Sequence, residues 1–429
     1  MSGTKDFDAA FEQAASEKQA KDNVSKLDER EQRGVRPQAR CQGEGDPSGQ
    51  LVRQFVRPFV WRDPSTMPRR DWVYGRHLIR KFVSATFAPG GVGKSALVLA
   101  EAMAMASGKA LLGTMPRERL RVGYWNGEDP FEETQRRALA ACLLHDLGPD
   151  DLEGWLHLGS GREDELAIAE QTPSGATILE PNVEAVIETI RALRLDVVII
   201  DPFVSSHRVT ENDNNAIDLV AKRWAKIADM TNVAIDLVHH TRKTNGAETT
   251  VEDGRGAVAL LNAARSARVL NAMSKAERGL AGVKATEAYF RVENGKANLA
   301  PPAEGADWFQ VASIDLGNGE GSEPSDNVGA VRVWKWPDPF DGVTAADLLA
   351  VQKEIDGGEW REYHTAVDWA GKAVAKVLGL KLDEKADKQK AKDLLATWIK
   401  TGALICVPGK DERSRPRPLI EVGKWAEVV

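Results

Sequence analysis

The sequence predicts an α/β fold whose organising feature is a parallel β-sheet. A β-prone apolar run, Val83–Ala88, leads through a glycine-rich turn into a helical pattern that begins near Lys94. A second run, 195–200, is almost continuously apolar and β-branched, which is typical of a strand buried on both faces of a parallel sheet. With 429 residues, the chain is long enough for one large domain and a smaller one.

The composition argues against several classes of protein. The formal net charge is −7, so the chain is not a basic nucleic-acid coat, and any contact with nucleic acid must be local. Cys41, Cys142 and Cys406 lie far apart, so we expect neither a disulfide framework nor a zinc site. No apolar run approaches the about 20 residues of a membrane span. The charged N-terminus lacks the apolar core of a signal peptide, and we expect a cytoplasmic protein without membrane association.

The turn after Val83–Ala88 has the composition of a phosphate-binding loop. It follows the pattern G-x-x-x-x-G-K-[ST], with Ala88 in place of the first glycine. Glycines let backbone N–H groups converge on phosphate oxygens, and the N-terminus of the next helix adds positive partial charge. We expect Lys94 to contact the β- and γ-phosphates of ATP and the Ser95 hydroxyl to bind Mg²⁺. The expected nucleotide contacts are Pro89, Gly90, Gly91, Val92, Gly93, Lys94, Ser95 and Ala96.

Carboxylates follow two of the expected strands. Residues 121–126 predict a buried strand, which Glu128 and Asp129 follow before a helix opens. Ligands of open α/β sheets bind outside the carboxyl ends of the strands, so Glu128 is placed to orient and deprotonate a water that attacks the γ-phosphate. A helix N-cap role suits Asp129 better. The strand 195–200 ends at Asp201, where a buried carboxylate needs a cation, and we expect it to hold Mg²⁺ directly or through water.

A further strand, over 233–240, ends in two adjacent histidines. Successive side chains of a strand point to opposite faces, so His239 and His240 cannot together bind one metal ion. We assign His240 as the group that hydrogen-bonds the γ-phosphate and senses its loss, with His239 as the alternative. The polar segment 243–255 follows and looks mobile, and loops at the carboxyl ends of strands often carry function.

The remaining sequence divides into regions of different composition. Residues 1–50 are polar and mixed in charge, which predicts a disordered tail. The segment 160–180 is predicted to be a loop. Further strands, expected at 267–273, 288–292 and 308–311, complete a core domain over 51–316. A glycine-rich linker and a tryptophan-rich strand occupy 317–339.

Residues 340–429 predict a winged-helix domain. Helical patterns over 344–355, 365–378 and 387–401 precede two strands, Leu404–Val407 and Leu419–Val422, an order found in winged-helix forms of the helix-turn-helix. The loop between these strands would be the wing, and a solvated hairpin in a protein–protein module is the alternative. The cations of the wing that are available to phosphates are Lys410, Arg413, Arg415 and Arg417.

Taken in order, these motifs resemble those of the RepA-type hexameric replicative helicases, within the RecA-like P-loop ATPases. The resemblance covers about residues 70–315. The phosphate loop and the strand ends at Glu128, Asp201 and His240 are similar to the family's Walker A, catalytic-glutamate, Walker B and sensor motifs. Residues 255–265 are similar to its arginine-finger segment, and 296–298 fall where RecA-like proteins place a trans-acting basic residue. The resemblance therefore implies catalytic roles for Arg265 and Lys296 in a neighbouring subunit.

The resemblance also implies a function. It is that of a ring-forming DNA helicase or translocase that hydrolyses ATP with Mg²⁺ in plasmid, phage or mobile-element replication. Such a protein would be a homo-oligomer, expected to be a hexamer, acting on single-stranded DNA with a replication initiator or loader protein as partner. The alternative is a RecA-like regulatory or recombination-associated ATPase that binds DNA or a protein without unwinding. A small-molecule kinase is disfavoured, because no second-substrate pocket or lid is evident.

Overall fold

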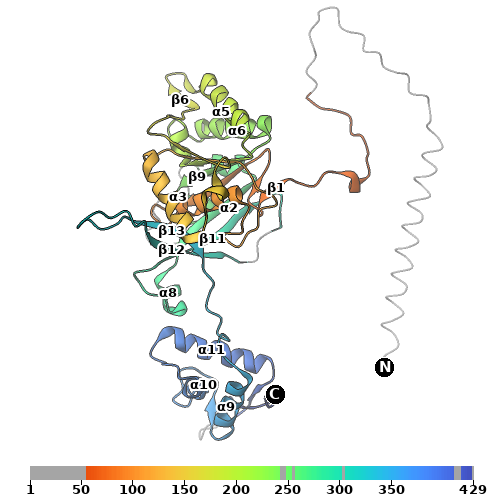
Figure 1. Cartoon of the computed structure of the whole chain (residues 1–429). Coiled ribbons are helices and arrows are strands. Elements are labelled where there is room, and N and C mark those ends of the chain that lie inside the picture. Colours follow the sequence, from red (N-terminus) through yellow and green to blue (C-terminus); the bar gives the residue numbers. More distant parts are fainter. Residues whose placement is uncertain (1–54, 242–247, 254–256, 302–304, 410–416, 428–429) are drawn as a thin grey trace, which may run out of the picture. The chain divides into compact units, whose positions relative to one another are not determined.

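The computed structural model describes residues 55–241, 248–253, 257–301, 305–409 and 417–427 (Figure 1). The expected disordered tail and most of the segment 243–255 lie outside these described residues. The chain divides into two units, Met1–Pro68 and Arg69–Val429. In the first unit, the described residues form a short 3₁₀ helix, η1 (Pro64–Thr66), which Asp63 caps by accepting a hydrogen bond from the Ser65 N–H at 2.8 Å.

The second unit contains the parallel sheet that the sequence predicts. Among the described residues, nine strands form this sheet in the order β13-β12-β11-β10-β3-β9-β8-β4-β5. The strands from β10 to β5 in this order run parallel, and β11, β12 and β13 add antiparallel neighbours. The strands are β3 (Val83–Ala88), β4 (Val122–Asn126), β5 (Leu156–Ser160), β8 (Val197–Asp201), β9 (Ala234–His240), β10 (Ser266–Ala272), β11 (Ala288–Ala297), β12 (Asp307–Asp315) and β13 (Asn327–Val333).

Helices cover both faces of the sheet. One hydrophobic cluster joins the sheet to helices α5, α6 and α7, and another joins it to α2 and α3. The helices of this region are α2 (Lys94–Ser107), α3 (Phe131–His145), α4 (Pro149–Leu152), α5 (Glu180–Leu193), α6 (Asn214–Thr231), α7 (Ala257–Ala263) and α8 (Lys275–Ala281). The 3₁₀ helices are η2 (Phe203–Ser206) and η3 (Val251–Asp253). No helix in the described part of the chain combines the length and apolar character that crossing a membrane requires.

Two expectations about this region are wrong. The segment 160–180, expected to be a loop, contains a hairpin of β6 (Ala169–Thr172) and β7 (Gly175–Ile178). The strand expected inside the linker 317–339 is β13, which is hydrogen-bonded to β12 as an edge strand of the main sheet. The sheet therefore extends beyond residue 316. A second small hairpin, of β1 (Trp72–Tyr74) and β2 (Leu78–Ile79), precedes β3.

Helix α2 is enclosed on almost every side. Its residues from Leu97 to Ala106 are all buried, although a surface helix would bury one stripe only. Some of them pack with β4 and β8, whereas Leu97 and Ala100 pack with Phe290 and Phe309 of the antiparallel strands. The strand β13 also accepts a hydrogen bond on Val331 O from the His145 ring of α3, at 2.9 Å. The antiparallel strands thus close over the helix that follows the phosphate loop.

The C-terminal elements have a hydrophobic core of their own, which includes Val351, Trp369 and Leu394. Their three strands pair in the order β14-β16-β15. The helix expected from residue 365 begins only at Gly371, and β14 was not expected. Arg417, expected to be available to phosphates, instead pairs with Asp368 at 2.8 Å. The elements are α9 (Ala345–Asp356), β14 (Trp360–Arg361), α10 (Gly371–Leu378), α11 (Lys385–Lys400), β15 (Leu404–Val407) and β16 (Leu419–Val422).

A buried polar network ties α2 to the sheet. The guanidinium of Arg268, on β10, donates to both carboxylate oxygens of Glu101, on α2, at 2.6 and 2.5 Å. It also donates to Thr86 Oγ1 at 3.0 Å, and Thr86 donates to Asp236 on β9 at 2.8 Å. All four side chains are buried. Buried charged groups are stable when each is paired and hydrogen-bonded, and the bidentate contact between Arg268 and Glu101 meets both conditions.

Replacement of Glu101 by Ala should therefore lower the free energy of unfolding by roughly 3–5 kcal/mol, because the Arg268 guanidinium would stay buried without its carboxylate. Urea denaturation followed by tryptophan fluorescence measures the change. The matched variant Glu101→Ala/Arg268→Met removes both charges and should recover much of the loss. Equal stability of wild type and Glu101→Ala would contradict a structural role for the pair.

Candidate nucleotide-binding site

The phosphate loop occupies the turn between β3 and α2, as the sequence predicts. Gly91 and Gly93 have φ angles of 79° and 110°, in the left-handed region that side chains rarely adopt. A Cβ atom at Gly93 would also lie 3.0 Å from Val311 Cγ2 and 3.2 Å from Phe290 Cε1. A Cβ atom at Gly91 would meet nothing within 4 Å, so this part of the loop borders open space. Gly91 and Gly93 thus allow the turn of the backbone, and Gly93 also allows the close approach of β11 and β12.

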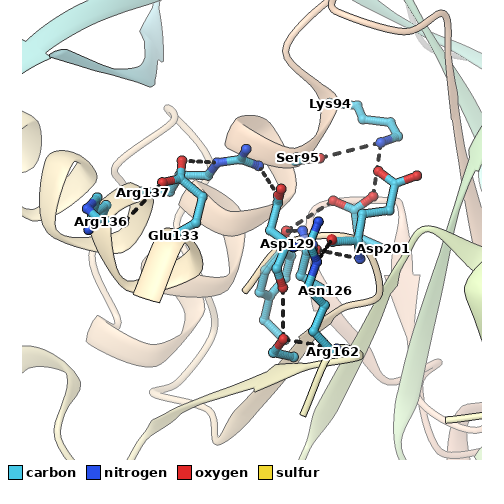
Figure 2. Close-up of polar contacts among 12 residues, drawn as sticks. Lys94, Ser95, Asn126, Asp129, Glu133, Arg136, Arg137, Arg162 and Asp201 are labelled. Carbon is cyan, nitrogen blue, oxygen red and sulfur yellow. Dashed lines mark hydrogen bonds and ion pairs between the residues drawn. The ribbon is translucent and has the colours of Figure 1, made fainter. Parts of the chain in front are cut away.

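Lys94 and Asp201 form a buried contact at the centre of the site (Figure 2). The Lys94 Nζ atom lies 3.1 Å from Asp201 Oδ1 and 3.4 Å from Ser95 Oγ. Lys94 is 7% exposed and Asp201 is fully buried. The Tyr124 hydroxyl donates to Asp201 Oδ2 at 3.0 Å, and burial, followed by the charge of Asp201, raises the pKa of this phenol well above its usual value. Tyr124 therefore remains a donor that orients the carboxylate.

The end of β4 is shaped by Asn126. Its Oδ1 atom accepts hydrogen bonds from the backbone N–H groups of Glu128 and Asp129, at 2.9 and 2.8 Å. The backbone N–H of Gly127 donates to the carbonyl of Asp201 at 2.8 Å, because β4 and β8 pair with Asn126 opposite Asp201. A Cβ atom at Gly127 would lie 2.3 Å from Ser205 Cβ, so only glycine fits there. These bonds hold both carboxylates in one turn.

The two carboxylates have different partners. Asp129 forms an ion pair with Arg137 of α3 at 2.8 Å, and Arg137 also reaches Glu133 at 3.3 Å (Figure 2). Pro130 occupies the N-cap position of α3, which no side chain caps, so the expectation that Asp129 suits the N-cap is wrong. The sequence analysis overlooked Arg137 and Asn126. For Arg137, the available signal was its i,i+4 spacing from Glu133. For Asn126, the signal was an asparagine shortly before a helix.

Glu128 and His240 lie at the mouth of the site. The Glu128 side chain is 55% exposed, and its Oε1 atom is 3.8 Å from His240 Nε2. Burial, followed by the positive charge of Lys94, lowers the pKa of His240, so the ring is neutral at neutral pH. His239 points to the other face of β9, where its ring lies edge-on to Phe87 and Phe203. Of the two histidines, His240 is the one that faces the phosphate loop.

A cavity of about 480 Å³ joins the phosphate loop to these strand ends. Of the expected loop contacts, Pro89, Gly90 and Val92 do not line it. The strand β13 contributes three lining residues that the sequence analysis assigned to a linker and therefore missed. The lining consists of Gly91, Gly93, Lys94, Ser95, Ala96, Glu128, Asp129, Glu133, Arg137, His240, Val311, Asn327, Val328 and Gly329.

Arg265 and Lys296 lie near the amino-terminal ends of the parallel strands, away from the phosphate loop. Ser266, next to Arg265, pairs with Ser84 near the start of β3, whereas the phosphate loop follows the end of β3. Four strand residues separate these levels, on the order of 13 Å. The Lys296 ammonium donates to the carbonyl of Leu261 at 2.6 Å, and burial, followed by the charge of Arg265, lowers its pKa. The structure does not bring either side chain to the phosphate loop of its own chain.

The oxygen ligands at the site suit a magnesium ion. The Ser95 hydroxyl and the Asp201 carboxylate both approach the Lys94 ammonium, within 3.4 Å and 3.1 Å. Mg²⁺ is commonly held by one or two protein oxygens together with waters and phosphate oxygens. Within the described residues, no group of three or more histidine, cysteine, aspartate or glutamate side chains could hold a metal ion. The donor set thus fits a metal ion that binds together with phosphates.

A protein-family model matches the part of the chain that contains these motifs. Residues 53–246 match the sequence model of an AAA domain family, described as "AAA domain", and the match spans the phosphate loop, Glu128, Asp201 and His240. No curated protein sequence gives a match. Solved structures that match include a KaiC-like protein from Pyrococcus horikoshii OT3, with 12% identity and a TM-score of 0.40, covering 62% of this chain and 99% of its own. The family match and the geometry of the loop identify a P-loop ATPase domain in this chain.

Proposed function

We propose that the chain is a ring-forming, ATP-driven DNA helicase or translocase. The observation that carries this proposal is the separation of Arg265 and Lys296 from the phosphate loop of their own chain, across the length of β3. Cations that resemble catalytic residues yet lie near the amino-terminal ends of the parallel strands, away from their own phosphate loop, are suited to a neighbouring subunit's site. A ring of subunits would bring these strand ends against the phosphate loop of the next subunit.

The proposed hydrolysis uses the strand ends of one subunit. Lys94 and the N-terminus of α2 would bind the phosphates of ATP. Ser95 and Asp201 would hold Mg²⁺, which when bound neutralises phosphate charge. Asp129 is neutralised by Arg137 at 2.8 Å, whereas the ion-pair contact of the exposed Glu128 carboxylate within the described part of the chain is with the neutral His240 ring, at 3.8 Å. We therefore assign Glu128 as the carboxylate that accepts a proton from the attacking water, and His240 as the group that senses the γ-phosphate.

The C-terminal elements support a winged-helix assignment. Their order is helix, strand, helix, helix and two strands, and β14 pairs with β16 in the manner of a third strand beside the hairpin. Of the expected wing cations, Arg417 is held by Asp368, and the other three lie outside the described residues. We assign this region to recruitment, through duplex DNA or a replication initiator or loader protein, and we assign contact with single-stranded DNA in the ring to the segment 243–255.

The role of Glu128 in hydrolysis is tested by replacing each of the two carboxylates. Glu128→Gln should retain ATP binding but lower the turnover of ATP by about 10²-fold or more, the range for a positioned general base. Steady-state ATPase assays and calorimetric titration with ATP measure the two properties. The matched variant Asp129→Asn, which loses an ion pair with Arg137, should lower turnover much less. If Asp129→Asn is inactive and Glu128→Gln is normal, the two assignments are reversed.

Assembly is tested by mixing inactive subunits. Arg265→Ala subunits keep Lys94, and Lys94→Ala subunits keep Arg265, so a mixed ring contains some complete interfaces if Arg265 acts in trans. We expect the mixture to regain part of the ATPase activity that each variant alone lacks. The control mixes Lys94→Ala with Lys94→Ala/Arg265→Ala, in which no interface is complete. Mixtures that co-assemble without regaining activity would indicate a structural role for Arg265.

Strand displacement on a forked DNA separates the two candidate functions. A helicase should displace the labelled strand in the presence of ATP and Mg²⁺, and single-stranded DNA should stimulate its ATPase activity, with a strong dependence on salt. The Glu128→Gln variant serves as the control for displacement that does not need hydrolysis. Stimulated hydrolysis without displacement would favour the regulatory or recombination-associated ATPase that binds DNA without unwinding.

A further inference from the structure

Two adjoining cavities lie apart from the ATP site. One, of about 500 Å³, is bordered by Trp308, Trp334 and Trp336, and the other, of about 380 Å³, by four arginines. They share Gly75 and Arg76, in the turn between β1 and β2, and neither shares a lining residue with the cavity at the phosphate loop. We refer to them together as the tryptophan–arginine face. Its exposed cations are Arg69, Arg70, Arg76, Arg117 and Lys335.

The aromatic part of this face is a compact cluster. The ring centroids of Trp308 and Trp334 are 5.8 Å apart, and Trp336 lies 5.1 Å from the first and 5.4 Å from the second. Trp336 is the outermost of them and is 39% exposed, whereas the other two are half-buried. The ATP site uses none of these rings. Flat indole surfaces that remain partly open to solvent are suited to stacking against another planar group.

The charged part of the face is positive on a chain whose net charge is −7. Among the described residues, Arg69, Arg76 and Arg117 form no ion pair, and Arg70 donates to the carbonyl of Leu299 at 2.8 Å. Asp307 is the exposed carboxylate of the lining, since Glu101 is buried and held by Arg268. Arginines without acidic partners, gathered on an acidic protein, mark a surface that attracts a polyanion.

We propose that the tryptophan–arginine face binds single-stranded nucleic acid, with a base stacked on the tryptophan cluster and the adjoining phosphates on the arginines. The polymer provides both planar rings and regularly spaced charges, which match the tryptophans and arginines of the two adjoining cavities. Duplex DNA keeps its bases stacked inside, and an acidic peptide lacks the rings. This inference rests on the proposed function in taking nucleic acid as the partner, and it adds a site separate from the segment 243–255 and the wing.

The face is also connected to the ATPase machinery. Glu101 and Arg268 line the larger cavity, and Glu101 belongs to α2, the helix that begins with Lys94. The bidentate contact between them, at 2.6 and 2.5 Å, fixes the cavity floor to this helix. A nucleic acid bound on the tryptophan–arginine face would therefore lie against residues of α2, the helix that begins with the phosphate-binding Lys94.

The test measures the binding of a fluorescein-labelled oligothymidylate, of about 20 nucleotides, to the full chain by anisotropy without ATP. Trp336→Ala should weaken binding about tenfold, from loss of a stacking surface. Arg76→Ala/Arg117→Ala should weaken it by a similar factor and reduce the salt slope by about 1.4, for two lost phosphate contacts. The matched controls, Trp61→Ala and Arg191→Ala/Lys226→Ala, remove exposed residues elsewhere and should bind within about twofold of wild type.

The outcomes separate this inference from the proposed function. If wild type binds the oligonucleotide and the face variants bind as the controls do, the inference is overturned and the proposed function stands. If wild type does not bind, the nucleic-acid partner is wrong and both fail. Polyglutamate of matched length and thymidine monophosphate serve as competitors beside unlabelled oligonucleotide. If either displaces the labelled oligonucleotide at the concentration at which unlabelled oligonucleotide does, the assignment to a single strand is overturned. Competition by the oligonucleotide alone supports it.

Discussion

The contact between Lys94 and Asp201 is the constraint on which the rest of the nucleotide site depends. Removing two such charges from water costs several kcal/mol for each, and only close pairing with further hydrogen bonds offsets that cost. The pairing requires β8 to end beside the phosphate loop, Tyr124 to point at the second carboxylate oxygen and Gly127 to approach Ser205 without a side chain. Each of these requirements fixes one strand end relative to the others. The same requirements place Glu128 and His240 at the mouth of the cavity.

The parallel core could be predicted from sequence because its signals are local. The strands β3, β8 and β9 are β-prone and largely apolar. β3 leads directly into the glycine-rich loop, and β8 and β9 end in Asp201 and His240, whose polar side chains need a ligand or partner. The hairpin of β6 and β7 was missed because its strands have four residues each and are only partly buried, so no apolar pattern marks them. The strand β13 was placed in a linker because it is an edge strand whose burial depends on helices far away in the sequence.

The parts of the site that sequence analysis missed depend on partners. Arg137 is an ordinary helix residue until the turn at Asn126 brings Asp129 to it. The segment 327–329 reaches the phosphate loop only because the antiparallel strands close over α2. The tryptophan–arginine face combines residues from 69–76, 117 and 308–336, which meet only in the folded sheet. The expected roles of Arg265 and Lys296 depend on a second subunit and stay predictions.

The enclosure of α2 has a mechanical consequence. A helix packed between the parallel strands on one side and β11 to β13 on the other cannot tilt by itself, because any movement would open voids in two hydrophobic clusters at once. The buried Glu101–Arg268 contact adds an anchor midway along the helix. The phosphate loop, which leads into α2, is therefore held in a fixed position relative to the sheet. By contrast, the Glu128 and His240 side chains are 55% and 35% exposed, so they can move without opening such voids.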